Sequence, residues 1–594
     1  MLTALDEYGP DGFAQWAKGA AALGQQRMLV TVESQQDPLP RYDDTTHLAI
    51  AADIRLDNRT ALGSALGISP AEQNQLSDSQ LILQGYRRWG ENCPNYFLGD
   101  FALAIWDPQT KVLFCARDPI GAKPFYYSLS PRGFFFASDI KGVLAAPGVS
   151  HQLDDGYIAA SLLDKFFVSP DHTFFQAIRK LPPGHTLTVQ PDAVRLEQYW
   201  FPERSPEVRF SSDAEYADAF LEIYTQAVHD RLPSRYSLGV HLSGGLDSSS
   251  IAVMAAREMR RQGRPAPATF CWQPPPVGSS STAQEYALIQ AVCAQEGLHP
   301  TYQAPSPEDI LATFRRDAAC EPTVGTLLNE LAIQRQAATQ GVRVLLSGWG
   351  GDEGAAFNGR GYFPELLLKG RWQRLYHEGK ALADHPWNFI LMAALLPLVH
   401  SQAPKFLRQL RQGKWPVSDF PLIHPDFVRR VKPLCRQHYR EIGVRQTQLQ
   451  LLANGHITAR IEAWAASGAQ NQIVYRYPLL DRRVLEFALG LPPEQFRRRR
   501  WNRWLMRNTL QQILPSEVCW NANKADPIRV QALREAIAET LPLIAKSLTS
   551  RSTPPTRAGY VDVPRLMEYL DADKFRADPK LGNIRTALQF LDLE

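Results

Sequence analysis

Residues 237–255 read SLGVHLSGGLDSSSIAVMA, a pattern that predicts a buried strand ending at Leu242, a glycine-rich turn and then a helix. In an open parallel sheet, ligands bind beyond the carboxyl ends of the strands, where this turn is expected. Glycines let a ligand approach the backbone, and hydroxyls and unpaired helix N–H groups offer donors to an anion: Ser243, Gly244, Gly245 and Ser248. Asp247 lies among these donors, which indicates that a cation shares the site. The stretch therefore predicts a site for a phosphate chain with Mg²⁺, and a plain tight turn is the alternative.

Alternating strands and helices continue around this stretch. Strand-like ATFCWQ (268–273) and VRVLLS (342–347) are interleaved with helix-like segments. This alternation predicts an α/β fold with a doubly wound parallel sheet, and the mostly helical sequence from about Phe357 onward predicts a helical extension. No GxxxxGK[ST] motif occurs, so we expect the turn to hold a pyrophosphate rather than a γ-phosphoryl group in transfer.

The first third of the chain has a different texture. Short runs such as HLAIAADIRL (47–56) and FALAIWD (101–107) carry β-branched and aromatic residues, with Asp, Gly and Pro at the breaks. They predict an α+β domain of packed antiparallel sheets. The polar, proline-bearing stretch 200–213 is typical of a linker, so we expect two domains, at 1–205 and 206–594.

Composition excludes several classes of protein. With 594 residues, 44% hydrophobic and 21% charged, the chain is expected to fold into more than one domain. A net charge of +3 gives no bulk signal for nucleic acid, and seven cysteines without a CxxC pair argue against a structural zinc site. The longest apolar run, 389–399, is far shorter than the ~20 residues of a membrane span. Because the start also lacks a signal peptide, we expect a cytoplasmic protein without a membrane span or a nucleic-acid partner.

A second acidic motif follows the strand at 342–347. In VLLSGWGGDEG (344–354), Asp352 is expected at the same sheet edge as Asp247. Mg²⁺ usually takes one or two protein carboxylates together with phosphate oxygens, so the two aspartates could share one ion. The plainer alternative is a polar turn that caps the next helix.

Together these motifs resemble the ATP pyrophosphatase branch that contains asparagine synthetases, β-lactam synthetases and lasso-peptide macrolactam cyclases. FALAIWDPQTKVLFCARDPIGAKPFYY (101–127) and TFFQAIRKLPPGH (173–185) resemble its glutaminase-like domain, and VYRYPLLDRRVLEFALGLPP (474–493) resembles its later helical signature. The resemblance implies an amino-terminal Ntn-type sandwich domain, a carboxyl-terminal ATP-pyrophosphatase domain, and the use of ATP and Mg²⁺.

The same resemblance assigns roles to single residues. It implies that the nucleotide is bound by Leu242, Ser243, Gly244, Gly245, Asp247, Ser248 and Gly348. Asp247 and Asp352 would ligate the metal ion. Lys524 would stabilise charge on the reacting phosphate and on the tetrahedral intermediate. Arg476 would orient a phosphate or carboxylate, or would merely pair within the helical domain.

The amino-terminal domain departs from the active glutaminases of this family. Those enzymes use an amino-terminal cysteine as nucleophile, whereas this chain opens Met1-Leu2-Thr3 and its first cysteine is Cys93. The family's Asn-Gly oxyanion segment is replaced by Ala51-Ala52, which removes a side-chain donor. We therefore expect a degenerate, structural domain that lacks its nucleophile and does not supply ammonia from glutamine.

That loss favours an amine that belongs to the substrate, because ring closure within one bound molecule gains strongly from proximity. The β-lactam synthetases use a tyrosine and a glutamate to deprotonate the amine, but the matching positions here hold Trp349 and Val474, neither of which is a base. Glu462 is a possible substitute base, and an ordinary helix position explains it equally well. The chain therefore looks most like a lasso-peptide macrolactam cyclase, with a precursor peptide as substrate and a leader-peptide protease as implied partner.

Some of the sequence leaves alternatives open. The arginine-rich FRRRRWNRWLMR (496–507) could hold an acidic peptide or a nucleic acid, but we favour a solvated helix face. A β-lactam-type or ammonia-dependent asparagine-type synthetase is the alternative enzyme, and an inert nucleotide- or peptide-binding scaffold is the alternative from another class. Peptide identity, ring size and oligomeric state are not encoded in any motif.

Overall fold

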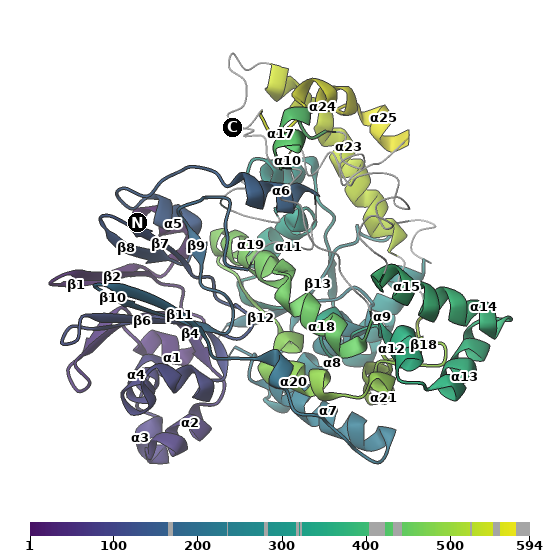
Figure 1. Cartoon of the computed structure of the whole chain (residues 1–594), viewed down its shortest axis with the longest axis horizontal. Coiled ribbons are helices and arrows are strands. Elements are labelled where there is room, and N and C mark those ends of the chain that lie inside the picture. The colour runs from purple at the N-terminus through teal and green to yellow at the C-terminus, as the bar shows by residue number, and fades with distance from the viewer. Residues whose placement is uncertain are drawn as a thin grey trace.

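The structure is a computed structural model of the whole chain (Figure 1). It describes residues 1–163, 170–233, 236–277, 283–316, 320, 324–402, 422–431, 442–522, 526–549, 559–577 and 588. The catalytic role predicted for Lys524 therefore concerns a residue outside the described part of the chain.

The amino-terminal domain is built on two stacked antiparallel sheets. The larger sheet has the strand order β11-β10-β6-β5-β4-β3, and the smaller one has the order β8-β7-β9. The strands are β3 (Arg41–Asp43), β4 (Leu48–Leu56), β5 (Gly99–Asp107), β6 (Val112–Arg117), β7 (Tyr126–Ser130), β8 (Gly133–Ala137), β9 (Arg179–Lys180), β10 (His185–Gln190) and β11 (Ala193–Gln198), with a separate hairpin of β1 (Phe13–Lys18) and β2 (Ala21–Gln26). The helices are α1 (Val32–Gln36), α2 (Arg59–Leu66), α3 (Pro70–Gln73), α4 (Asp78–Trp89), α5 (Ile140–Leu144) and α6 (Asp155–Leu163).

Apolar residues on both faces of β4 and β5 explain why the larger sheet is covered on both sides. Ile50 packs with the apolar face of α4 on one side, whereas Ala104 packs with Phe125 on the side of the smaller sheet. Alternate residues of a strand point to opposite faces, so a strand that is apolar throughout must be buried on both. The predicted α+β sandwich is confirmed.

The carboxyl-terminal domain contains a five-stranded sheet with the order β14-β13-β12-β15-β16, in which each adjacent pair is parallel. Its strands are β12 (Ser237–His241), β13 (Ala268–Cys271), β14 (Pro300–Tyr302), β15 (Val342–Leu346) and β16 (Val474–Arg476). One face packs against α7 (Asp213–His229), α8 (Leu246–Arg261) and α9 (Gln284–Glu296), and the other against α11 (Glu330–Thr339) and α19 (His456–Gln470). The predicted doubly wound parallel sheet is confirmed.

The rest of the domain is mostly helical, as the sequence predicts. Its elements are α10 (Pro307–Phe314), α12 (Tyr362–Leu368), α13 (Trp372–Leu382), α14 (Pro386–Ile390), α15 (Leu396–Gln402), α17 (Pro425–Val431), α18 (Val444–Ala453), α20 (Arg482–Gly490), the hairpin β17 (Arg497–Arg498) and β18 (Trp501–Asn502), α21 (Trp504–Leu510), α22 (Ser516–Cys519), α23 (Pro527–Thr549), α24 (Val563–Tyr569) and α25 (Ala572–Ala577). Among the described residues, no single helix is long and apolar enough to cross a membrane; segments 372–382 and 386–399 reach that length and composition only as a pair bent by 110°.

Candidate active site

The glycine-rich turn after β12 and the loop after β15 touch at the carboxyl end of the sheet. Gly244 has a φ of +71°, and a Cβ there would lie 2.8 Å from the Cβ of Leu288. A Cβ on Gly348 would lie 2.7 Å from the backbone N of Ser248, closer than real side-chain carbons come. Glycine is therefore required at both positions, at one by the backbone conformation and at both by close approach.

Hydrogen bonds fix the shape of the turn. The Ser243 N–H donates to Ser248 Oγ over 3.1 Å, and the two hydroxyls lie 2.9 Å apart. Gly245 is the N-cap of α8 and supplies no side chain to cap it. The first N–H groups of α8 are thus available to an anion at the positive end of the helix dipole, as predicted for a phosphate chain.

Asp247 and Asp352 converge on a single cationic group. Arg503 Nη1 lies 3.0 Å from Asp247 Oδ2, and Arg503 Nη2 contacts Asp352 Oδ1. Carboxylate oxygens are ligands that Mg²⁺ prefers, so the chemistry of Asp247 and Asp352 fits the predicted metal site. Arg503 is a functional candidate that sequence reasoning missed, because it adopts a φ of +56° outside any helix and reaches across the fold.

These residues border a cavity of about 740 Å³, here called the central cavity. The turn residues Ser243 to Ser248 line one end of it, together with Gly348, Asp352 and Arg503. Asn521, Ala522 and Asp526, on either side of the gap that contains Lys524, also line it. Of the predicted nucleotide-binding set, only Leu242 does not line it; this residue is buried at the end of the strand.

Aromatic and acidic side chains also line the central cavity. Trp272, Trp349 and Trp464 line it, together with Glu330 and His456. The Glu330 carboxylate is fully buried and accepts hydrogen bonds from Trp272 Nε1 at 2.9 Å and from the hydroxyl of Tyr475 at 2.6 Å. The cavity therefore brings backbone N–H groups that can meet an anion together with aromatic and acidic side chains.

Arg476 lies outside the central cavity. It is buried at the interface of the two domains, where Nη1 donates to the Arg231 carbonyl oxygen over 2.8 Å. Burial, with repulsion from Arg55 and Arg231, lowers the pKa of Arg476 to about 9. The structure thus separates Arg476 from the other predicted site residues and gives it neighbours in the domain interface instead.

Glu462 also faces away from the central cavity. It lies between Lys180 and Arg117 of the amino-terminal domain, at 2.6 Å and 3.1 Å, and its side chain is 1% exposed. A carboxylate clamped by two cations in the interface cannot reach an amine in the central cavity. The interpretation as a substitute base is therefore wrong, because the side chain points from α19 toward the other domain.

The arginine-rich stretch 496–507 is not a solvated helix face. It forms the hairpin of β17 and β18, and α21 begins only at Trp504. Arg503 reaches the two aspartates, and Arg507 is buried and donates to the carbonyl oxygens of Asn502 and Asn521. The prediction of a solvated helix face for 496–507 is wrong, because residues with positive φ angles interrupt the helix that the spacing of the arginines suggests.

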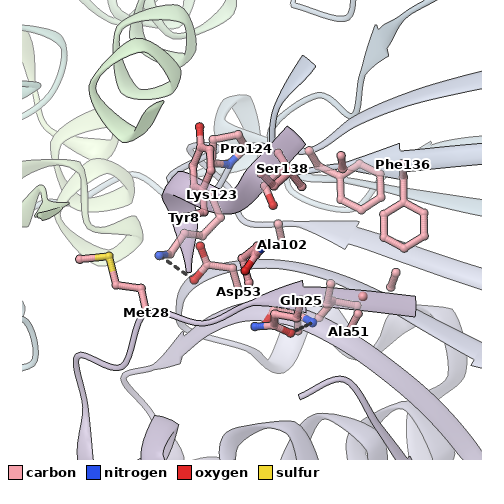
Figure 2. A pocket seen from close by; sticks show the side chains of 18 of the residues that line it. Tyr8, Gln25, Met28, Ala51, Asp53, Ala102, Lys123, Pro124, Phe136 and Ser138 are labelled. Carbon is pink, nitrogen blue, oxygen red and sulfur yellow. Dashed lines mark hydrogen bonds and ion pairs between the residues drawn. The ribbon is translucent and has the colours of Figure 1, made fainter. Parts of the chain in front are cut away.

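A second cavity, the amino-terminal cavity, lies between the two sheets and α19, with a volume of about 810 Å³. Figure 2 shows Ala51 on its wall, near Asp53 and Lys123, which form an ion pair at 2.7 Å. Gln25 Nε2 donates to the Ala52 carbonyl oxygen over 2.8 Å. No cysteine is found among the described residues that line this cavity.

The two cysteines of the described amino-terminal domain are in its core. Cys93 and Cys115 are both 0% exposed, and burial raises the pKa of both thiols. A nucleophilic cysteine needs a lowered pKa and access to its substrate, and neither thiol has these properties.

Family models divide the chain into the same two parts. A model described as a glutamine amidotransferase domain matches residues 1–200, and one described as asparagine synthase matches residues 219–586, more than half of the chain. The predicted boundary after residue 205 falls between the two matches.

Curated relatives agree with this assignment. Asparagine synthetase [glutamine-hydrolyzing] 3 of Bacillus subtilis is 31% identical over 44% of this chain and 43% of its own length. Asparagine synthetase [glutamine-hydrolyzing] 1 of the same organism is 24% identical over 88% of this chain and 82% of its own length. The amidase chyE of Penicillium rubens is 27% identical over 47% of this chain and 42% of its own length. In two of these three comparisons the chain spans less than half of the relative. From its two domains and the model that matches most of its length, this chain belongs to the asparagine synthase family.

Proposed function

We propose that the chain is an ATP-dependent amide-forming ligase whose substrate is a precursor peptide. It would adenylate an Asp or Glu side-chain carboxylate of that peptide and close a macrolactam ring with the peptide's own α-amine. Membership of the asparagine synthase family supports the ATP-dependent amide chemistry. The choice of a peptide amine over ammonia depends on the amino-terminal domain.

The observation that carries this choice is the lining of the amino-terminal cavity. Ala51 and Ala52 stand where the family resemblance expects oxyanion donors, and no cysteine is among the described lining residues. Two polar groups of the lining are already engaged, Asp53 with Lys123 and Gln25 with the backbone. A cavity whose described lining offers no cysteine, and alanines in place of the oxyanion segment, is unsuited to glutamine hydrolysis, which supports an amine from another source.

Packed aromatic rings separate the two cavities, which also argues against transfer of ammonia. Trp349 and Trp464 line the central cavity, and Tyr475 and Tyr477 line the amino-terminal cavity. The Trp464 and Tyr475 ring centroids lie 4.8 Å apart, and those of Trp349 and Tyr477 lie 6.2 Å apart. An amine that is part of the bound peptide needs no path through this wall.

Under the proposal, the turn residues bind the phosphates of ATP, and Asp247 and Asp352 would hold Mg²⁺. The ion, when bound, neutralises phosphate charge and makes pyrophosphate a better leaving group. The peptide carboxylate attacks the α-phosphorus and pyrophosphate leaves. The α-amine then attacks the activated carbonyl carbon, loses a proton and displaces AMP, and Lys524 is proposed to stabilise the charge that develops.

The test compares amine sources in one purified preparation. With ATP, Mg²⁺ and precursor peptides encoded beside the gene, we expect ATP–pyrophosphate exchange and a peptide product 18 Da lighter than the substrate, the mass of one water. Asp247→Asn should abolish both. Incorporation of ¹⁵N-ammonia into free aspartate, without any peptide product, would instead establish the asparagine-type alternative, which the relatives' names favour. Absence of exchange with every carboxylate would favour the inert scaffold.

If peptides are the substrates, a protease that removes a leader segment and exposes the α-amine must act beforehand. We propose such a protease as a partner, because the ring-forming amine has to be free before it can attack.

A further inference from the structure

One arginine that lines the central cavity has no anionic partner among the described residues. Arg460, on α19, lines the cavity and lies between two indole rings, with its guanidinium carbon 4.8 Å from the Trp349 ring centre and 4.6 Å from that of Trp464. Its Nε is buried and has no hydrogen-bond partner. Cation–π attraction to two rings holds a guanidinium in place and leaves its N–H groups able to meet a ligand.

The acidic residues beside Arg460 make their hydrogen bonds to other groups. Glu330 accepts from His241, Trp272 and Tyr475. Glu353 Oε1 accepts from His456 Nε2 over 2.8 Å, and its Oε2 is buried without a hydrogen-bond partner among the described residues. Within the described part of the chain, no carboxylate oxygen lies within 4.0 Å of the Arg460 guanidinium. Burial lowers the pKa of Arg460, although the two glutamates partly oppose this effect. A buried guanidinium without a direct counter-ion is costly unless a ligand supplies one.

The position of Arg460 relates it to the reacting phosphate. One of its two stacking partners, Trp349, directly follows Gly348, whose Cα is packed against the backbone of Ser248 in the phosphate-binding turn. An anion bound at the edge of Arg460 would therefore share the central cavity with the phosphate chain, beside the residue that follows the contact between Gly348 and Ser248. In an adenylating enzyme, the acyl donor must lie in the same cavity as the phosphate chain so that its carboxylate can reach the α-phosphorus.

We infer that Arg460 is the receptor for the acyl-donor carboxylate, which it binds through the paired N–H groups of its guanidinium between Trp349 and Trp464. The inference rests on the proposed function for the identity of that carboxylate as a peptide Asp or Glu side chain. Arg460 selects a planar carboxylate over a neutral amide because it offers only donors, which match two anionic oxygens but not an NH₂ group. The indoles exclude water and strengthen this selection.

The experiment measures binding rather than turnover, with two small probes. N-acetyl-aspartate α-methylamide carries only the side-chain carboxylate, and N-acetyl-asparagine methylamide is its neutral counterpart. Both are titrated into the full-length protein with Mg²⁺ and α,β-methylene-ATP, which cannot be cleaved to pyrophosphate. The proteins are wild type, Arg460→Met, Arg460→Lys and Arg88→Met, a control that removes an exposed arginine stacked on Trp89 far from the cavity.

We expect wild type and Arg88→Met to bind the acid in preference to the amide. Arg460→Met should bind the acid roughly 10- to 100-fold more weakly and lose the preference, because charge-assisted hydrogen bonds are lost. Arg460→Lys keeps the charge but not the paired donors, so its affinity for the acid should lie between those of wild type and Arg460→Met. This variant also provides the test if Arg460→Met does not fold. Binding of the ATP analogue should be unchanged throughout.

Any one of three results overturns the inference: folded Arg460→Met still prefers the acid over the amide, Arg460→Lys prefers the acid as strongly as wild type does, or wild type shows no preference. These results are distinct from failure of the proposed function. If Arg460 binds the acid but no peptide is cyclised, the receptor stands and the cyclase proposal falls. If Arg460→Met cyclises peptide with wild-type KM and kcat, the cyclase proposal stands and the receptor falls.

Discussion

Replacing Glu462 with glutamine should uncouple the two domains. Its carboxylate lies 2.6 Å from Lys180 Nζ and 3.1 Å from Arg117 Nη2, and the three side chains are at most 3% exposed. Removal of one member of a buried charge cluster leaves the others uncompensated and typically costs about 3–5 kcal/mol. Two cations remain here, so we expect a loss within that range and a fall in melting temperature of roughly 2–4 °C, because the entropy of unfolding is large for a chain of 594 residues.

The dependence on pH identifies the cause. Burial alone would raise the pKa of Glu462, but the charges and hydrogen bonds of Lys180 and Arg117 hold it below the ordinary value. A carboxylate with a lowered pKa stabilises the folded state above its unfolded pKa, about 4.3, and this stabilisation is lost as the pH falls through the folded value. The difference in stability between wild type and Glu462→Gln should therefore be full at pH 7 and shrink below about pH 4.3.

The assay is thermal unfolding followed by circular dichroism, with Glu535→Gln as the matched control. Glu535 pairs with Arg576 at the surface, where its side chain is 48% exposed, so its replacement should hardly change the melting temperature. Folded Glu462→Gln should also retain ATP–pyrophosphate exchange, because the residue does not line the central cavity. Equal melting temperatures for the two variants would refute the reasoning about the buried cluster.

Three further outcomes follow from the site and the core. Gly348→Ala should lower ATP–pyrophosphate exchange by about 100-fold, because its Cβ would lie 2.7 Å from the Ser248 backbone N; an unimpaired variant would contradict the contact of the two loops. In Arg503→Met, Mg²⁺ or Mn²⁺ should raise the melting temperature more than in wild type, because no guanidinium competes with the ion for Asp247 and Asp352. Equal increases in the two proteins would show that the Arg503 guanidinium does not occupy the place of the metal ion. Cys93 and Cys115 should react with maleimide only after unfolding, since both are buried and their thiol pKa values are raised, and rapid labelling of the native protein would disprove this.

The phosphate-binding turn could be predicted from the sequence because its determinants are local. The apolar strand, the glycines and the first residues of the helix are contiguous in 237–255, and the structure forms β12, the turn and α8 from them. Gly348 and Asp352 follow the neighbouring strand β15, so the rule that parallel strands deliver their carboxyl ends to one edge was enough to bring them together.

Arg503 could not be predicted in the same way. It is 256 residues from Asp247 and 151 from Asp352 along the chain, and it lies in a run of arginines whose spacing suggests a helix. Arg499 and Arg503 have φ angles of +51° and +56°, so the run folds as a hairpin and Arg503, which directly follows the hairpin, turns into the site. Tertiary contacts decided this conformation against the local pattern.

Helix α19 shows why residue type alone could not decide between the two roles left open for Glu462. Successive residues of an α-helix point about 100° apart, so three neighbours cover most of its circumference. Arg460 faces the central cavity, Ile461 lines the amino-terminal cavity, and Glu462 meets the cations of the other domain. The sequence shows a helix with a possible acid or base, but the direction of each side chain depends on where the helix is packed. Because residues of α19 line both cavities, a step of two residues along the helix separates Arg460, the proposed receptor for the carboxylate, from Glu462 at the domain interface. A base for the attacking amine must therefore be sought among side chains on the Arg460 side of this helix and not at Glu462.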